Sequence, residues 1–147
     1  MVDVPSASDA ERFLQEAEQL NPGAWIRHSR FVADAAKAIA EADPDLDPTR
    51  AHCLGLLHDI GRRTGRTSMR HIIDGYQFLM DKAFDGAARI CMTHSFVLQD
   101  TDAVFGEWDC STAERTFVDD YILGLKYTLY DRLLQLCDAL ALPSGFV

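Results

Sequence analysis

Long hydrophobic runs are missing from the chain. No stretch of about 18 or more apolar residues occurs, and this is the length that a membrane-spanning helix begins to need. The first residues also lack the charged start, apolar core and small-residue cleavage site of a secretory signal. Neither a membrane partner nor secretion is indicated, and we expect a cytoplasmic protein.

Basic residues are few compared with acidic ones. The chain of 147 residues has 14 Lys and Arg against 23 Asp and Glu, which leaves a net charge of −9. A negative field repels long polyanions, and this argues against nucleic acid as the main partner. Small phosphorylated molecules remain compatible, because divalent cations and a few arginines can reverse the potential inside a cleft.

Closely spaced cysteine pairs are missing as well. The four cysteines are Cys53, Cys91, Cys110 and Cys137, and none of them forms a CxxC motif. All except Cys110 lie in apolar helical patterns. This arrangement suits buried, reduced thiols in a cytosolic enzyme rather than a disulfide framework.

The alternating apolar pattern of strands is not convincing anywhere, whereas helical periodicity runs through most of the chain. With 48% apolar residues, the sequence predicts one all-α domain, residues 1–147, folded as a compact bundle of about six to seven helices. The expected helices cover residues 9–20, 24–42, 48–61, 69–82, 86–93, 113–123 and 127–140. Positions expected to face the core include Leu20, Ile39, Leu129, Leu133, Leu136 and Leu140.

Local signals place several helix ends. Ser8 is expected to cap the first helix, and Asp47 with Pro48 at the first helical position should open the third. Gly61 is the expected left-handed residue at the end of the third helix. Residues 111–114, Ser-Thr-Ala-Glu, resemble a capping box before the sixth helix.

The most informative segment is residues 56–61, Leu-Leu-His-Asp-Ile-Gly, at the end of the third expected helix. Adjacent helical residues point about 100° apart. His58 and Asp59 therefore cannot form an ordinary pair on one face, but both can reach one ion beside the helix end. Imidazole and carboxylate together suit a divalent metal. Further ligands would come from distant histidines and acids.

The order of His28, His58-Asp59 and Asp138 resembles the HD-domain superfamily of metal-dependent phosphohydrolases. The similar segments are residues 28–36 (His-Ser-Arg-Phe-Val-Ala-Asp-Ala-Ala), 55–62 (Gly-Leu-Leu-His-Asp-Ile-Gly-Arg) and 136–140 (Leu-Cys-Asp-Ala-Leu). The resemblance covers residues from about 24 to about 142. It implies an all-α HD-type bundle with the metal in its core, and a first ion held by His28, His58, Asp59 and Asp138.

The resemblance also implies a second ion. Many members of the superfamily bridge two ions through the motif aspartate and add two further histidines. His71 and His94 stand where those histidines are expected, so we predict a binuclear centre with Asp59 as the bridge. Iron, manganese, zinc, cobalt and nickel all suit these ligands, and the sequence leaves the metal identity and the number of ions open.

Asp59 and Arg62 are the expected catalytic residues. Two ions about 3.5 to 4 Å apart lower the pKa of a shared water for attack at phosphorus and neutralise charge on the leaving oxygen. Arg62 matches the basic position after the family motif, and a guanidinium binds phosphate oxygens in bidentate fashion. Arg63, Arg66 and Arg70 follow in the same basic stretch. The expected substrate is a nucleotide or another small phosphate ester.

Two other functions fit the same residues. Mixed-valent di-iron oxygenases related to myo-inositol oxygenase use almost the same ligand order, so the ligands alone do not separate them from hydrolases. Degenerate relatives act as non-catalytic nucleotide-binding regulatory modules, but such members commonly lose ligands. The complete set here, together with Arg62, favours hydrolysis.

The remaining polar residues have ordinary interpretations. His52 matches no family position and is expected to be structural. Asp131 should pair with a basic neighbour, because it lies about 10 Å along the helix from Asp138. Asp74 lies three residues after His71 and would either orient that imidazole or face water.

Two segments are left open by the sequence. Residues 95–110 are irregular and contain Phe96, Phe105 and Trp108, so they form either a lid over the site or a packed loop. The apolar residues 143–147 suggest either a truncated end or a contact with another subunit, and a homo-oligomer is therefore possible.

Overall fold

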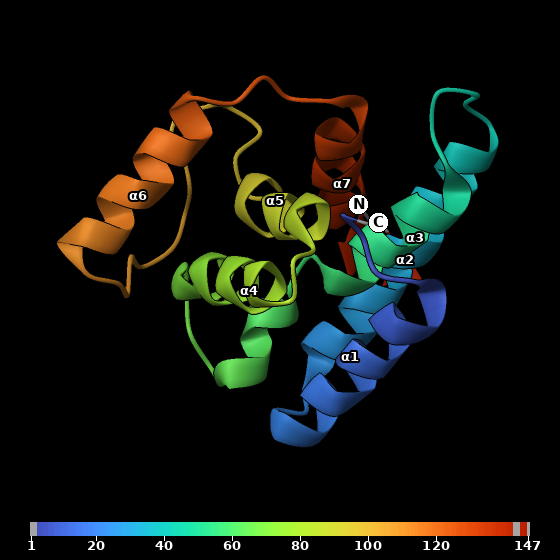
Figure 1. Ribbon diagram of the computed structural model, residues 1–147, viewed down its shortest axis with the longest axis horizontal. Helices are drawn as coiled ribbons and strands as arrows, with labels where there is room; N and C mark the ends of the chain where they lie inside the picture. Colours follow the sequence, from blue (N-terminus) through green and yellow to red (C-terminus); the bar gives the residue numbers. More distant parts are fainter. Residues whose placement is uncertain (1–2, 143–144, 147) are drawn as a thin grey trace.

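The computed structural model describes residues 3–142 and 145–146, and this part of the chain is helical almost throughout (Figure 1). Seven α-helices and one 3-10 helix, η1, occur within these residues, which confirms the all-α prediction. They are α1 (Ala7–Leu20), α2 (Ala24–Glu41), α3 (Pro48–Leu57), η1 (Ile60–Thr64), α4 (Arg70–Asp81), α5 (Asp85–Thr93), α6 (Thr112–Leu123) and α7 (Leu129–Leu140).

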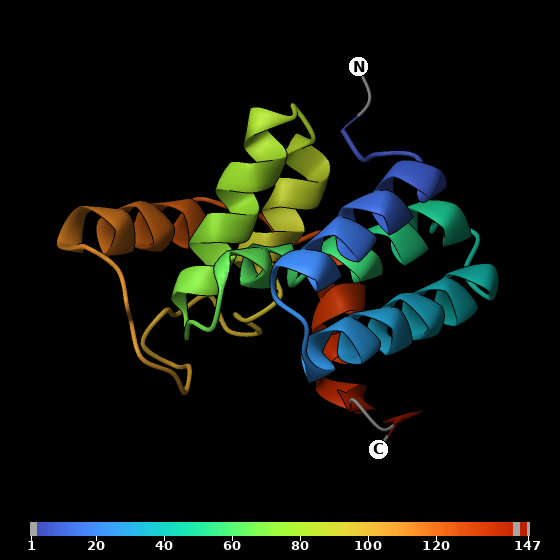
Figure 2. The same cartoon turned by 90° about the horizontal axis from the view of Figure 1, so that it is seen from below.

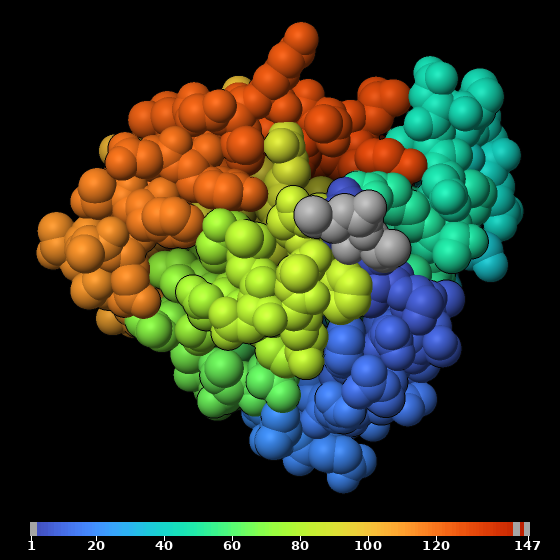
Figure 3. All heavy atoms as spheres, in the orientation of Figure 1, coloured from blue at the N-terminus to red at the C-terminus, as the bar shows by residue number. Residues whose placement is uncertain are grey.

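The helices form two groups, one of α1, α2 and α3 and the other of α4 and α5, and the two groups meet around α7. Helices α1 and α3 pack together, α3 also packs against α2, and α4 pairs with α5 (Figures 1 and 2). Helix α7 contacts α2, α3 and α5, so it joins the two groups. Helix α6 lies at the outer side, next to α5, and the sphere view places it at the edge of the molecule (Figure 3). The segment between α3 and α4 contains η1, which contacts both α1 and α4, so this segment lies where the two groups meet.

Capping explains where several helices begin. The Oγ atom of Ser6 accepts a hydrogen bond from the Asp9 amide at 3.2 Å, so Ser6 caps α1 and the predicted cap at Ser8 is wrong. Asp47 caps α3 as predicted. Ser111 and Glu114 form the predicted capping box of α6.

Gly61 does not end a helix in the left-handed conformation, so that prediction is wrong. Helix α3 stops at Leu57, and η1 continues through residues predicted to lie in the same helix and the following loop. The positive φ falls on Gly65 instead, at 135°. Gly61 is required for another reason: a Cβ atom there would collide with the carbonyl oxygen of His71 and would lie 2.5 Å from the Gly75 amide nitrogen. The residue lets η1 and α4 approach closely.

Gly61→Ala should therefore destabilise the fold. The added methyl group meets backbone atoms of α4, which cannot rotate away, and we expect the free energy of unfolding to fall by about 1–3 kcal/mol. Urea denaturation measures this change. Gly124→Ala, at an exposed helix end with a φ of −82°, is the control. Equal losses in the two variants would contradict the role of close approach.

Several apolar residues predicted to face the core are partly exposed. The exposed fractions are 60% for Leu20, 37% for Ile39, 53% for Leu129, 50% for Leu136 and 38% for Leu140. Besides the predicted Leu133, helix α7 buries Leu134 and Cys137, because the face that meets α2, α3 and α5 is rotated away from most of the leucine stripe. Only Leu133 of the predicted positions on α7 is buried.

A short hairpin follows α7. Strand β1 (Ala141–Leu142) pairs antiparallel with β2 (Gly145–Phe146), and the sequence did not predict these strands. The tail predicted as a truncated end or a subunit contact lies partly outside the described residues, at positions 143, 144 and 147. None of the helices described in residues 3–142 is long and apolar enough to cross a membrane.

The cysteines are free thiols. Cys53, Cys91 and Cys137 are buried, and Cys110 is half-buried, as their surroundings in the sequence predicted. The Cys91 thiol donates a hydrogen bond to the carbonyl oxygen of Leu57. No cysteine of the described residues belongs to the groups that could hold a metal.

Candidate metal centre

Six of the residues that the sequence singled out converge in the core. Each lies at or near the beginning or end of a helix, where side chains from different directions can point toward the same place. His28 lies in the first turns of α2, His58 caps the end of α3, and Asp59 follows it. The remaining members are His71 at the start of α4, His94 at the end of α5 and Asp138 near the end of α7.

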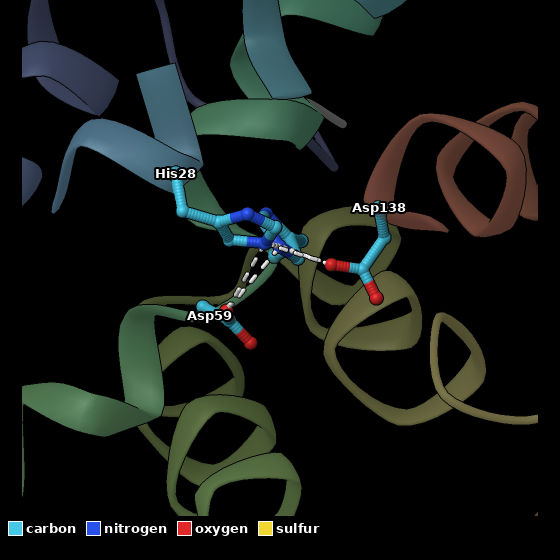
Figure 4. A group of neighbouring side chains, drawn as sticks. His28, Asp59 and Asp138 are labelled. Carbon is cyan, nitrogen blue, oxygen red and sulfur yellow. Dashed lines mark hydrogen bonds and ion pairs between the residues drawn. The ribbon is translucent and has the colours of Figure 1, made fainter. Parts of the chain in front are cut away.

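The first group consists of His28, His58, Asp59 and Asp138, and its possible ligand atoms all lie within 4.8 Å of one another. The Nε2 atom of His28 is 2.8 Å from Oδ1 of Asp138, and Nε2 of His58 is 3.3 Å from the same oxygen. Asp59 contributes Oδ2, which lies 3.4 Å from Nε2 of His58. In Figure 4, His28, Asp59 and Asp138 point toward one another from separate elements.

The second group consists of Asp59, His71 and His94, all of them buried. Oδ1 of Asp59 lies 3.1 Å from Nε2 of His71 and 3.3 Å from Nε2 of His94. Asp59 therefore turns one oxygen to each group. This is the arrangement that a bridging carboxylate requires.

All four of these histidines hold their rings in the same way. In each one, Nδ1 lies within hydrogen-bond distance of a backbone carbonyl, which can only accept, so Nδ1 carries the proton and Nε2 is left facing the cluster. The pairs are His28 with Ala141 at 3.0 Å, His58 with Gly55 at 2.7 Å, His71 with Ser68 at 2.7 Å and His94 with Ile90 at 3.0 Å. Backbone atoms thus favour the tautomer in which Nε2 is available as a ligand atom.

The cluster has nitrogen and oxygen atoms that could bind a cation, but too few hydrogens to pair these atoms with one another. A histidine protonated at Nδ1 alone offers a lone pair at Nε2, as a metal ligand must, and the Nε2 atoms of His28 and His58 lie just 3.3 Å apart. Among the described residues, Oδ1 of Asp59 and Nε2 of His71 are buried and, although they lie 3.1 Å apart, neither makes a hydrogen bond. Unpaired buried polar atoms are costly. A divalent ion bound by nitrogen and oxygen would satisfy all of them.

The charges in the cluster favour a positive charge at this place. Burial alone would raise the pKa of the Asp59 carboxyl, but the neighbouring imidazoles, above all His58, outweigh burial and hold that pKa well below its usual range. The pKa of Asp138 is lowered too, because His28 and His58 outweigh the effect of its burial. Burial lowers the pKa of His58, yet Asp59 and Asp138 raise it well above its usual value. Both carboxylates stay ionised and favour positive charge beside them.

Arg62 lies at the edge of the cluster. Its Nε atom is 3.4 Å from Oδ2 of Asp59, and its side chain is 32% exposed. Its carbonyl oxygen accepts a hydrogen bond of 2.7 Å from Nδ2 of Asn21, which ties this segment to the turn before α2. Arg63 stacks on Phe78, with its Cζ atom 4.2 Å from the ring centre, away from the cluster. Arg62 is the arginine of this stretch that combines access to solvent with contact to the motif.

A cavity of about 460 Å³ opens above the cluster. Its lining includes Arg62 and five of the six candidate metal ligands, His28, Asp59, His71, His94 and Asp138. A larger hollow of about 740 Å³ contains none of them. The arginines that line it, Arg50 and Arg89, are already paired with Asp3 and Asp131. Of these two cavities, the smaller is the one that the candidate metal ligands line.

The other predictions for polar residues had mixed outcomes. Asp74 does not orient His71, because the ring of His71 uses the Ser68 carbonyl, and Asp74 accepts from the Thr64 hydroxyl instead. Asp131 pairs with Arg89 at 2.8 Å, which confirms the expected basic partner. His52 belongs to neither group.

Sequence reasoning missed Thr93 and Gln135, which together with Asp131 hold α5 against α7. The hydroxyl of Thr93 donates to Asp131 at 2.8 Å, and Nε2 of Gln135 donates to the carbonyl oxygen of Thr93 at 3.0 Å. All three side chains are buried. They fix the end of α5, and His94 follows directly. Polar residues in an otherwise apolar helical stripe were the available signal.

In a comparison with protein-family models, the HD domain model matches residues 25–142, which is most of the chain. The chain belongs to the HD domain family. The resemblance predicted from the His-Asp motif is thus confirmed. HD domains form a superfamily of metal-dependent phosphohydrolases and bind divalent metals, which agrees with the two groups of this HD domain.

Searches of curated proteins and of solved structures found no match to the chain.

Proposed function

We propose that this HD domain is a phosphohydrolase that acts on a small phosphorylated molecule at a binuclear metal centre. One observation carries the proposal: the four histidines fix Nδ1 on backbone carbonyls and turn Nε2 toward Asp59 or Asp138. Asp59 belongs to both groups. A purely structural cluster would not need every imidazole in the same tautomer.

The chain's residues divide the work as follows. His28, His58, Asp59 and Asp138 would hold one ion, and Asp59, His71 and His94 the other. Bound divalent ions would supply Lewis acidity and an acidified water for attack at phosphorus. Asp59 would bind both ions and so fix the two ion positions relative to each other. Arg62, at the cavity wall, would bind a phosphate oxygen and orient the ester.

The position of Arg62 favours hydrolysis over the oxygenase alternative. The guanidinium lies beside the motif carboxylate and reaches the cavity, where it can neutralise an anionic substrate. The complete ligand set argues against a regulatory module without metal, since binding alone would not need two groups that share one carboxylate.

The test is metal analysis together with a substrate panel. Purified protein is loaded separately with manganese, zinc, cobalt, nickel or iron, and phosphate release is measured from nucleotides and other phosphate esters. We expect release that depends on metal and is lost with a chelator. A mixed-valent iron signal in electron paramagnetic resonance with no phosphate release would overturn the proposal in favour of an oxygenase. Ligand binding without turnover would favour the regulatory module.

The two ions should be separable by mutation. His94→Ala removes a ligand only from the second group and should lower the metal content from about two ions per chain toward one, with at least a 100-fold loss of activity. Inductively coupled plasma mass spectrometry gives the metal content. His52→Ala, outside both groups, should leave both quantities unchanged. An unchanged metal content in His94→Ala would contradict the binuclear assignment.

A further inference from the structure

The walls of the metal cavity differ in chemistry from its floor. The floor is made of candidate ligands and is polar, whereas the rest of the lining includes the buried Met69 and two more exposed aromatic residues, Trp25 and Phe105, which form its rim. Trp25 lies in the first turn of α2, and Phe105 lies in the connection between α5 and α6. Two aromatic rings from distant parts of the sequence thus border the same cavity.

Phe105 is fully open to solvent, with an exposed fraction of 107%. The other aromatic residues of its connection are packed: Phe96 is buried, and its ring stacks on Trp108 with centres 6.1 Å apart. The connection therefore contains both a packed part and an open side chain. The packed-loop and lid interpretations each describe one portion of it.

The backbone beside Phe105 is anchored to the start of α4. The Met69 amide donates to the carbonyl oxygen of Glu107 at 3.0 Å, and the Glu107 amide donates to Oγ of Ser68 at 2.9 Å. Asp109 accepts from the amide of Ser68 at 2.8 Å. The exposed ring therefore stands two residues from a fixed point, at the mouth of the cavity, and is not part of a loose end.

Trp25 is also fixed. Its indole Nε1 donates to the carbonyl oxygen of Asn21 at 2.9 Å, and the side chain of Asn21 donates to the carbonyl oxygen of Arg62 at 2.7 Å. The indole and the proposed phosphate-binding arginine are thus tied to the same turn. The ring is half-buried, and it reaches the cavity.

We propose that Trp25 and Phe105 are stacking walls that select a substrate with a planar aromatic ring next to its phosphate, as in a nucleotide. This inference rests on the proposed phosphohydrolase function. The polar floor would take the phosphate and the aromatic rim the base. A nucleobase stacks on an aromatic ring and removes apolar surface from water. A sugar phosphate would leave Phe105 exposed and gain little from either ring.

The test compares two substrates that differ in the base. The manganese-loaded protein is assayed with adenosine 5′-monophosphate and with ribose 5-phosphate. We expect the wild type to prefer the nucleotide at least about 10-fold in kcat/KM. Phe105→Ala and Trp25→Ala should lower kcat/KM for the nucleotide by about 5- to 100-fold, mainly through KM. Ribose 5-phosphate should change by less than about two-fold.

Controls separate stacking from folding and from general hydrophobicity. Phe105→Tyr and Trp25→Phe retain a ring and should keep most of the preference, whereas Phe105→Leu should lose it. Leu98→Ala is the matched control, because Leu98 is an exposed apolar residue of the same connection that does not line the cavity. Equal effects of Phe105→Ala on both substrates, or no preference in the wild type, would overturn the inference and leave the hydrolase function standing.

A different result marks failure of the proposed function itself. If no phosphate ester is hydrolysed with any metal, calorimetric titration with adenosine 5′-monophosphate still decides the stacking walls. Binding that Phe105→Ala weakens about 5-fold or more and Leu98→Ala leaves unchanged would support them. Binding that is equal in wild type and Phe105→Ala would overturn them.

Discussion

Asp59→Ala should remove both metal ions and reduce phosphate release by roughly 10³-fold or more. Asp59 is the one residue that belongs to both candidate groups, and each of its oxygens faces a different one. Its loss leaves three ligands in one group and two in the other. We expect a metal content near zero after gel filtration, whereas His94→Ala should retain about one ion.

Mass spectrometry of the metals and a phosphate-release assay test this prediction. Asp34→Ala is the control, since Asp34 is an exposed carboxylate on α2 that lies near His52 and outside both groups. Circular dichroism checks that the helices are retained. Near-normal metal content in Asp59→Ala would refute the bridging role, whatever the activity.

Asp131→Ala should cause a large loss of stability. The carboxylate is fully buried and accepts hydrogen bonds from Arg89, Thr93 and the Thr128 amide. Removing it leaves a guanidinium and other donors unpaired, and breaking a buried ion pair costs about 3–5 kcal/mol. Urea denaturation measures the change in the free energy of unfolding. The end of α5 should loosen with it, so metal binding at His94 should weaken.

Asp119 offers a matched control. It also accepts from an arginine and a threonine, Arg115 and Thr101, but its side chain is 37% exposed. Asp119→Ala should therefore cost no more than about 1 kcal/mol. A similar loss in both variants would show that burial is not what makes the Asp131 pair important.

Asp131 should also make the stability of the fold depend on pH. Burial acts to raise the pKa of Asp131, but the hydrogen bonds from Arg89, Thr128 and Thr93 outweigh it and lower that pKa below its usual value. Its contribution is therefore complete above the unfolded pKa of about 3.9 and is lost as pH falls through the lower folded value. The stability difference between wild type and Asp131→Asn should be constant above pH about 5 and shrink in stronger acid. A constant difference down to pH about 2 would contradict this assignment.

Local patterns were sufficient to predict the helices. Apolar periodicity and caps such as Asp47 and the 111–114 box act within a few residues, so the sequence contains the needed information. Which face of α7 is buried could not be predicted, because that depends on how α2, α3 and α5 meet it. The same limit explains Gly61, whose close neighbour His71 is ten residues away on another helix.

The candidate ligands could be predicted because their order along the chain is characteristic of the family. The groups that hydrogen-bond to these ligands and orient them could not be predicted. The Ser68 carbonyl, rather than Asp74, orients His71. Only the bend before α4 brings that carbonyl within hydrogen-bond distance of Nδ1. Trp25 and Phe105 carry no motif, and the folded chain alone brings them to one cavity.

The hairpin after α7 has a practical consequence for anyone who engineers this chain. The Ala141 carbonyl holds the Nδ1 atom of His28, so a ligand near the beginning of the protein depends on the backbone near its end. Deleting the residues after Leu140 would remove this acceptor and leave that ring free to rotate and expose either nitrogen. Preparations altered in this way should lose metal selectively from the group that contains His28, even though no ligand has been mutated.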